Sequence, residues 1–327
     1  MNPVGANAIS HASLEQAAQW YVQLNDQQVG AQQRQHWQAW LAQSPEHQAA
    51  WHYVERVGQR FAALQEDHPQ AASHVLRNTA RSILSRRHTV KSLLVLVSGG
   101  WLGWTAWQKS SLPLTLTRWS ADFATGTGEM REAQLSDGSR IWLNALSALD
   151  VRFDSNQRLL LLQAGEVLID TAREPGRPLR VQTAQGWMRA LGTRFSVRQE
   201  DQHTLLNVYE GAVEVRTRQG QVQVVEAGRQ LRFSEHHSPA PTAASATREA
   251  WRRGLLVADN LPLGQLIEEL SRYRPGHLGC DPAVAGLPVM GSFPLKDTDQ
   301  ALRLLEAALP VRVEKPLAWW VSVGPKN

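Results

Sequence analysis

Hydrophobic positions near the N-terminus recur at the three- and four-residue spacing of amphipathic helices. The spacing predicts a first helix that starts at the capping box Ser13–Gln16 and a second helix over about residues 31–42. A third helix is expected where Ser44 precedes Pro45, because a serine cap followed by proline at the first helical position is a start signal. The pattern therefore predicts a small all-α domain over residues 1–76.

A run without any charged or histidine side chain extends from Ser92 to Gln108. Together with Lys91 it is long enough for a helix of about 30 Å, the thickness of one bilayer core. We therefore expect residues 91–108 to form a single transmembrane helix. A buried helix of a soluble domain is the alternative, because three glycines make the run less apolar than a typical span. The basic tether 77–90 predicts a cytoplasmic N-terminus and an exported C-terminus.

Two adjacent arginines, Arg86 and Arg87, lie just before this run, with Ser85 before them and Lys91 after them. This arrangement is typical of a twin-arginine export signal, which serves cargo that is already folded. The alternative is that both arginines belong to the positive charge found on the cytoplasmic side of many spans. Both interpretations place the chain after the run outside the cytoplasm.

From Trp119 onward the hydrophobic period changes from 3.6 to 2, the period of β-strands. Strand-like runs recur at roughly ten-residue spacing, and glycines separate them. The dipeptide Asp137-Gly138 between two alternating runs predicts a tight hairpin. We expect an all-β domain over residues 119–235, and a sandwich, a barrel and a stacked β-roll all fit the pattern.

The remaining chain changes pattern twice. Residues 236–249 are rich in Pro, Ala, Ser and Thr, which is typical of a linker. In residues 250–327 helical patterns, over about 263–273 and from Asp297 onward, alternate with strand-like runs. Because the strand–helix–strand unit occurs twice, this block predicts a small α+β sandwich.

Composition narrows the range of functions. The formal net charge of +4 arises largely next to the predicted span, so nothing requires a direct nucleic-acid partner. Cys280 is the single cysteine and cannot form an intrachain disulfide. Nucleophile–base pairs and metal-ligand spacings are not apparent, and the adjacent His236 and His237 are expected to be solvated. We therefore expect no cofactor, no metal and no enzyme activity on an external substrate.

Several sequence phrases, taken together and in order, resemble the FecR family of transmembrane anti-sigma regulators over nearly the full length. They are Ala17–Trp20, Trp37–Leu41, Pro45 and Ala49–Trp51 near the N-terminus, and Leu135–Asn144, Gly165–Val167, Ala190–Val197 and Glu210–Val215 in the β region. The C-terminal block is similar to the short domain shared by secretins and the N-terminal extensions of TonB-dependent receptors.

The resemblance implies a single-pass inner-membrane protein with a cytoplasmic N-terminus and a periplasmic C-terminus. The cytoplasmic domain would hold an extracytoplasmic-function sigma factor. The C-terminal block would contact the periplasmic signalling domain of a TonB-dependent outer-membrane receptor for a siderophore or haem. Trp37, Trp40 and Trp51 are candidate partner-binding residues, and packing in the core of the helical domain is the alternative for each.

The resemblance also implies self-cleavage at the bond between Gly192 and Thr193, by an N-to-O acyl shift followed by hydrolysis of the ester. The alternative is an ordinary Gly-Thr pair that enters a strand. Two other functional classes stay open. The predicted cytoplasmic domain argues against an envelope structural or assembly protein with a secretin-like module, and the lack of convergent catalytic residues argues against an exported enzyme acting on cell-wall polymers.

Overall fold

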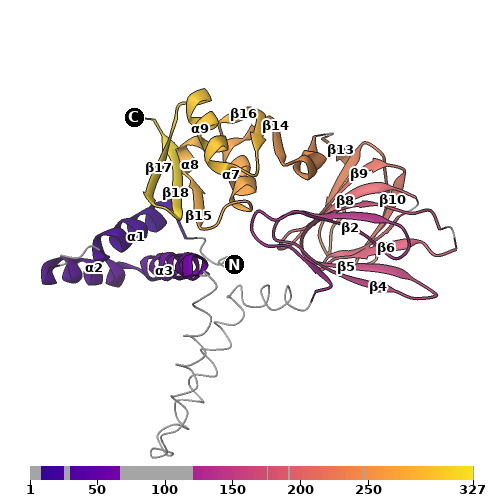
Figure 1. Cartoon of the computed structure of the whole chain (residues 1–327), viewed down its shortest axis with the longest axis horizontal. Helices are drawn as coiled ribbons and strands as arrows, with labels where there is room; N and C mark the ends of the chain where they lie inside the picture. The colour runs from indigo at the N-terminus through magenta and orange to yellow at the C-terminus, as the bar shows by residue number, and fades with distance from the viewer. Residues whose placement is uncertain are drawn as a thin grey trace, which may run out of the picture. The chain divides into compact units, whose positions relative to one another are not determined.

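The computed structural model describes residues 9–25, 30–66 and 121–326, apart from residues 175, 191 and 246 (Figure 1). The chain divides into two units. The first contains the N-terminal helices together with Ala258–Phe293 and Asp297–Asn327, and the second contains the β region together with Pro294–Lys296.

The predicted transmembrane helix at 91–108, the tether 77–90 and the arginines Arg86 and Arg87 lie outside the described residues. Among the residues that the structure does describe, no helix is both long enough and apolar enough to cross a membrane.

Three helices form the N-terminal part: α1 (His11–Leu24), α2 (Ala31–Gln43) and α3 (Pro45–Glu66). The predicted starts of α2 and α3 are confirmed, and the Ser44 hydroxyl accepts a hydrogen bond from the N–H of His47 at 3.1 Å. The predicted cap of α1 is wrong: Ser10, not Ser13, caps the helix. The reason is tertiary, because the Glu46 carboxylate accepts the N–H of Ser10 and the hydroxyl of Ser13.

Thirteen strands form the β region of the second unit. They are β1 (Phe123–Ala124), β2 (Arg131–Gln134), β3 (Arg140–Leu143), β4 (Ala148–Phe153), β5 (Arg158–Asp170), β6 (Leu179–Gln182), β7 (Gly186–Ala190), β8 (Arg194–Gln199), β9 (Thr204–Glu210), β10 (Ala212–Thr217), β11 (Val222–Glu226), β12 (Arg229–Phe233) and β13 (Thr242–Ala243). One sheet has the order β1-β4-β5-β6-β7-β10-β11 and the other β2-β3-β5-β8-β9-β12-β13. The two sheets share β5, and only the β5–β6 pair among these strands is parallel.

Strand β5 changes sheets near Gly165. Before this glycine β5 pairs with β4 and β6, and from it onward with β3 and β8. Gly165 has φ +81°, and a Cβ there would collide with Ser147. Glycine is therefore required at this position, both by the backbone angle and by the close approach of the neighbouring chain.

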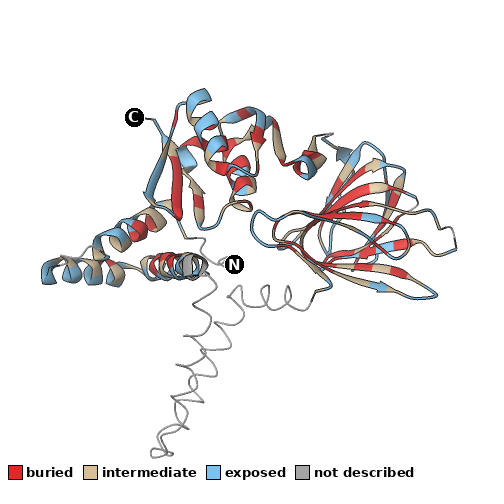
Figure 2. Cartoon of the chain, in the orientation of Figure 1, coloured by how far each residue is buried: buried red, intermediate tan, exposed pale blue. Residues whose placement is uncertain are grey.

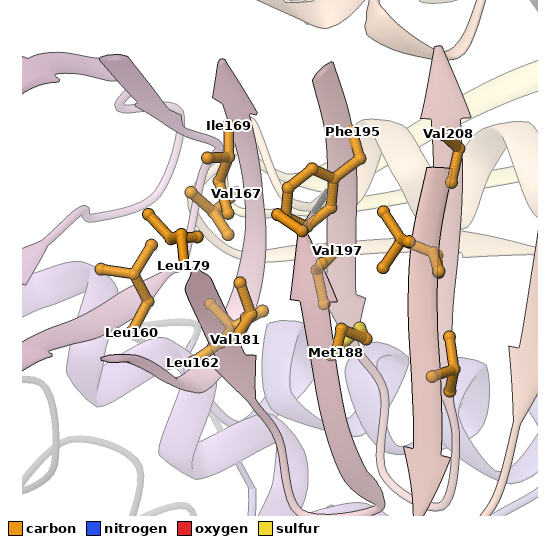
Figure 3. Close-up of a cluster of buried hydrophobic side chains, with 14 of the residues drawn as sticks. Leu160, Leu162, Val167, Ile169, Leu179, Val181, Met188, Phe195, Val197 and Val208 are labelled. Carbon is orange, nitrogen blue, oxygen red and sulfur yellow. The ribbon is translucent and has the colours of Figure 1, made fainter. Parts of the chain in front are cut away.

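The apolar core lies between the two sheets (Figures 2 and 3). Met188 of β7 comes from one sheet, whereas Phe195 and Val197 of β8 come from the other, and all three side chains are fully buried. Period-2 alternation puts such residues on the inward face of each strand. Of the three architectures that the sequence left open, the β region is thus a sandwich, joined along β5.

The turns of the β region agree only in part with the sequence. The hairpin predicted at Asp137-Gly138 is confirmed: Gly138 has φ +83°, and the Asp137 carboxylate accepts the N–H of Ser139 at 3.0 Å. The predicted linker 236–249, in contrast, contains strand β13 and the start of a 3-10 helix, η1 (Arg248–Arg253). Strand β13 pairs with β12, so part of this polar segment completes a sheet.

The C-terminal block has the predicted α+β composition. Its elements are β14 (Leu255–Pro262), α7 (Leu263–Ser271), β15 (His277–Cys280), α8 (Pro282–Ala285), β16 (Pro288–Pro294), α9 (Thr298–Ala308), β17 (Val311–Leu317) and β18 (Trp320–Pro325). Strands β14 and β16 form one small sheet, and β15, β18 and β17 form another in that order. The Asp297 side chain caps α9 as the sequence indicates, by accepting the N–H of Gln300 at 2.8 Å.

Candidate functional site

The bond between Gly192 and Thr193 lies immediately before β8. Gly192 has φ +81°, a left-handed conformation that side-chain-bearing residues rarely adopt. Thr193 is 3% exposed, and its hydroxyl has no hydrogen-bond partner among the described residues. Buried hydroxyls are normally satisfied, so an unpaired one beside a left-handed glycine is an unusual feature that calls for an explanation.

Thr171 fixes the backbone of Thr193 on both sides of the residue. The N–H of Thr193 donates to the Thr171 hydroxyl oxygen at 2.8 Å. The Thr193 carbonyl accepts the Thr171 N–H at 3.1 Å and the Thr171 hydroxyl at 3.0 Å. The threonine backbone is therefore held in one position, while its own hydroxyl stays unpaired.

Gly211 and a cavity complete the surroundings of this bond. A Cβ at Gly211 would lie 2.7 Å from the carbonyl oxygen of Gly192 and 2.8 Å from Cγ2 of Thr193, so the turn between β9 and β10 approaches the bond closely. A cavity of about 300 Å³ opens beside Gly192. Its walls include Arg158, Thr171, Arg173, Glu174 and Arg189.

The three tryptophans predicted to bind a partner lie in the core of the helical part. Trp40 and Trp51 are 7% and 8% exposed. The Trp40 indole N–H donates to the Gln16 side chain at 2.8 Å, and its ring stacks on His47 at 4.5 Å between centroids. Trp37 contacts Trp51 at 5.0 Å between ring centroids. Burial thus corrects the prediction for Trp40 and Trp51, which serve packing, as the alternative interpretation had it.

A second aromatic set lies on the outer side of α1 and α3, where β15 and β18 pack in the first unit. Tyr21 meets Trp319 edge-on at 5.3 Å between centroids. The Tyr53 hydroxyl lies 3.3 Å from Nδ1 of His277, and the Tyr53 ring lies 6.2 Å from that of Trp320. Helical spacing alone gave no signal for this set, because α1 and α3 each contribute one tyrosine.

Polar groups of α1 and β18 also contact one another in this part of the first unit. The Ser322 hydroxyl donates to the Glu15 carboxylate at 2.9 Å, and Glu15 lies 3.0 Å from His11. Gly58 allows the close approach, because a Cβ there would lie 2.8 Å from the Tyr21 hydroxyl. We call His11, Glu15, Tyr21, Tyr53 and Gly58 the aromatic face. Aromatic rings with a polar rim are typical of protein–protein interfaces.

Burial lowers the pKa of the His277 side chain, which contacts Tyr53, to about 4. The nearby His11 shifts this pKa in the same direction. Burial also raises the pKa of Tyr53 above its usual value. At neutral pH both side chains are therefore uncharged, which suits an interface that is mostly aromatic.

Comparisons with known families agree with this division of the chain. The described structure consists of a helical N-terminal part, a two-sheet β region and an α+β block. The sequence model of the FecR protein family matches residues 121–214. A second model, a domain of unknown function called DUF4880, matches residues 15–57, within the helical part. The β region thus contains a FecR-family domain, and the resemblance to this family noted from the sequence is confirmed.

Solved structures share the fold. Two crystal structures of a proposed anti-sigma factor from Parabacteroides distasonis ATCC 8503 are each 24% identical to this chain, with TM-scores of 0.55 and 0.54. Each match covers 63% of this chain, and 99% and 98% of the two solved chains respectively. At this level of identity the likeness concerns the fold. No curated protein sequence matches the chain.

Proposed function

We propose that this protein is an anti-sigma regulator whose helical part binds an extracytoplasmic-function sigma factor. The FecR-family domain and the fold shared with a proposed anti-sigma factor support this function. The observation that carries it is the aromatic face, because Tyr21 and Tyr53 of the helical part make their aromatic contacts with Trp319 and Trp320 of a distant segment, which shows that this face accepts aromatic partners from outside the helices. Tyrosine and tryptophan anchors provide most of the binding energy in many interfaces.

We further propose that residues 91–108 cross the inner membrane once, with the helical part in the cytoplasm and the rest in the periplasm. The periplasmic partner is then the signalling domain of a TonB-dependent siderophore or haem receptor. Strand β17 supports a contact through the C-terminal block, since it pairs only with β18 among the described strands, and the Glu306 side chain, which accepts the Val313 N–H at 3.0 Å, would have to move aside. An open sheet edge accepts an added strand from a partner.

In the structure, Trp319 and Trp320 cover Tyr21 and Tyr53 within one hydrophobic cluster. With the helical part and the C-terminal block on opposite sides of a membrane, this contact could not form within one chain, and the aromatic face would be open to the sigma factor.

Co-purification tests the sigma-binding proposal. The full chain is co-expressed with each extracytoplasmic-function sigma factor of its host, and the dissociation constant of any complex is measured. Losing an aromatic anchor costs about 2 kcal/mol or more, so Tyr53→Ala should weaken binding by about 30-fold. The exposed α3 residues His52 and Gln59 provide matched alanine controls. Failure to bind any sigma factor, or equal binding by Tyr53→Ala, contradicts the proposal.

We also propose that the bond between Gly192 and Thr193 cleaves itself. The Thr193 oxygen attacks the Gly192 carbonyl carbon, the C–N bond breaks, and the hydroxyl proton passes to the leaving nitrogen. Water then hydrolyses the ester to a Gly192 carboxylate and a free Thr193 hydroxyl. The unpaired Thr193 hydroxyl supports this step, and so does the Thr171 hydroxyl, which lies 2.8 Å from the nitrogen that must gain a proton.

Gel electrophoresis of the purified chain tests the cleavage. Two fragments are expected from the natural sequence and from Thr193→Ser, which keeps the hydroxyl, and one intact chain from Thr193→Ala. Circular dichroism checks that both variants fold. Two fragments from Thr193→Ala would exclude the acyl shift, and a single intact chain from the natural sequence would exclude cleavage itself.

A further inference from the structure

A basic cleft opens on the second unit, and neither Gly192 nor Thr193 is among its lining residues. It lies between the β2–β3 hairpin and η1, and its volume is about 720 Å³. Its lining includes Arg131, Glu132, Arg140, Trp142, Arg252 and Lys296. No step of the proposed functions uses these residues.

The wall that carries η1 is firmly held. The Glu249 carboxylate pairs with Arg194 of β8 at 2.6 Å, and Trp251 is 5% exposed. At the end of η1, the N–H of Gly254 donates to the Trp251 carbonyl at 2.8 Å. The Gly254 carbonyl in turn accepts the N–H of Leu295 at 2.9 Å, which places Lys296 at the cleft. The basic side chains of this wall are therefore presented from a fixed backbone.

The cleft is rich in unpaired positive charge. Five basic side chains line it against two acidic ones, Glu129 and Glu132. Arg140 pairs with Asp170 at 3.2 Å. The other basic lining residues have no carboxylate partner among the described residues: Arg131, Arg252, Arg253 and Lys296. An anionic ligand would be attracted here, and arginine forms bidentate pairs with carboxylates.

Trp142 forms the apolar floor under these charges. The guanidinium groups of Arg140 and Arg252 lie 5.5 Å and 4.9 Å from its ring centroid, within cation–π distance. Stacking on the indole restricts the orientation of both guanidinium groups. The indole N–H of Trp251, which also lines the cleft, is buried without a hydrogen-bond partner among the described residues.

The cleft also reaches strand β2, whose Arg131 and Glu132 line it, and this strand has a free edge. Strand β2 pairs only with β3 among the described strands. The N–H of Leu135 donates to the Ser139 carbonyl at 2.8 Å, and Ala133 pairs with Ile141 two residues further along. In an antiparallel ladder the alternate residues, Glu132 and Gln134, then direct their backbone groups to the open side.

We propose that this cleft binds an acidic segment of a partner protein, which adds to β2 as an extended strand. The strand edge selects a peptide, because its free N–H and C=O groups are complementary to another backbone. The unpaired arginines and Lys296 select acidic side chains on that peptide. Because β2 has four residues, the bound segment is about four to six residues long.

Selection from a random library of displayed peptides of about twelve residues tests the proposal on the full chain. Enriched peptides should be acidic, and their affinity should fall at least tenfold in the variant Arg140→Glu/Arg252→Glu and in about 0.5 M NaCl. Proline at alternate positions of a selected peptide should abolish binding, because proline cannot donate to β2.

The chain contains a matched control. Arg180 and Arg216 lie 5.6 Å and 5.0 Å from the ring centroid of Trp187, the same arrangement outside the cleft. The variant Arg180→Glu/Arg216→Glu should bind the selected peptides normally. The milder variant Arg252→Gln is tested as well, in case the double variant misfolds. Thermal unfolding compares the stability of all variants. No enrichment of acidic peptides, equal losses in both double variants, or tolerance of proline would each overturn strand addition at β2.

Discussion

A buried ion pair links the β2–β3 hairpin to the segment that holds the proposed cleavage bond. The side chains of Arg158 in β5 and Asp137 in the hairpin turn are 3% and 1% exposed, and their charged atoms lie 2.6 Å apart. The same guanidinium group donates to the Ala172 carbonyl at 3.2 Å, one residue after Thr171. We predict that removing the Asp137 charge weakens both the sandwich and the geometry around Thr193.

The expected magnitude follows from the burial of the pair. Breaking a buried ion pair by removing one partner costs about 3–5 kcal/mol, since the remaining charge is left uncompensated. Glu174 lies 3.5 Å from Nε of Arg158 but is 40% exposed, so it compensates only in part. Asp137→Asn keeps the oxygen that accepts the Ser139 N–H. We therefore expect a loss near the lower end of the range, about 3 kcal/mol.

Native-state hydrogen exchange of β5 peptides, followed by mass spectrometry, measures this loss within the second unit alone. A loss of about 3 kcal/mol corresponds to about a hundredfold faster exchange of globally protected amides. The double variant Asp137→Asn/Arg158→Met removes both charges and should recover most of the protection. A loss below about 1 kcal/mol for Asp137→Asn, or a double variant less protected than the single one, would refute the reasoning.

Three further predictions concern single positions. Gly211→Ala places a Cβ 2.7 Å from the Gly192 carbonyl oxygen at φ +75°. Thermal unfolding should show a loss of stability of about 1–3 kcal/mol, and an unchanged unfolding midpoint would contradict this. Burial lowers the pKa of His277 to about 4, so as the pH falls below 6.5 the unfolded chain binds a proton at His277 before the folded chain does. Protonation therefore favours the unfolded state between these two pH values. The contact of His277 with Tyr53 should weaken by about 2–3 kcal/mol by pH 4, and α3 hydrogen exchange in His277→Phe should lose this dependence. Hydrogen bonds from Ser10 and Ser13 lower the pKa of Glu46 to about 2. Glu46→Gln should therefore lower the melting temperature at pH 7 but not near pH 2, and equal effects at both would contradict it.

Local signals in the sequence predicted much of the fold. Ser44 and Pro45 located the junction of α2 and α3, because the capping preference acts within one turn. The change of period at Trp119 predicted the β region, and Asp137-Gly138 predicted its hairpin, since both depend only on neighbouring residues. The cap of α1 escaped prediction because Glu46, more than thirty residues away, selects Ser10 over Ser13.

The candidate sites depend on contacts between distant segments. Gly192 and Thr193 were noted from a resemblance, but Thr171 became visible only through the hydrogen bonds that its segment makes to Thr193. Helical spacing put Trp37 and Trp40 on one face of their helix, but it could not decide whether that face packs in the core or binds a partner. The positions of Tyr21 and Tyr53 beside Trp319 and Trp320 depend on contacts with a distant segment, which no local pattern encodes.

Site-specific photocrosslinking in cells tests most directly the claim that the aromatic face binds a sigma factor. A photoreactive amino acid replaces Tyr53 in one strain and the neighbouring, exposed His52 in another. A crosslinked product that contains a sigma factor is expected from position 53 and none from position 52. Absence of a sigma factor from the products at position 53, or equal yields from the two positions, would contradict it.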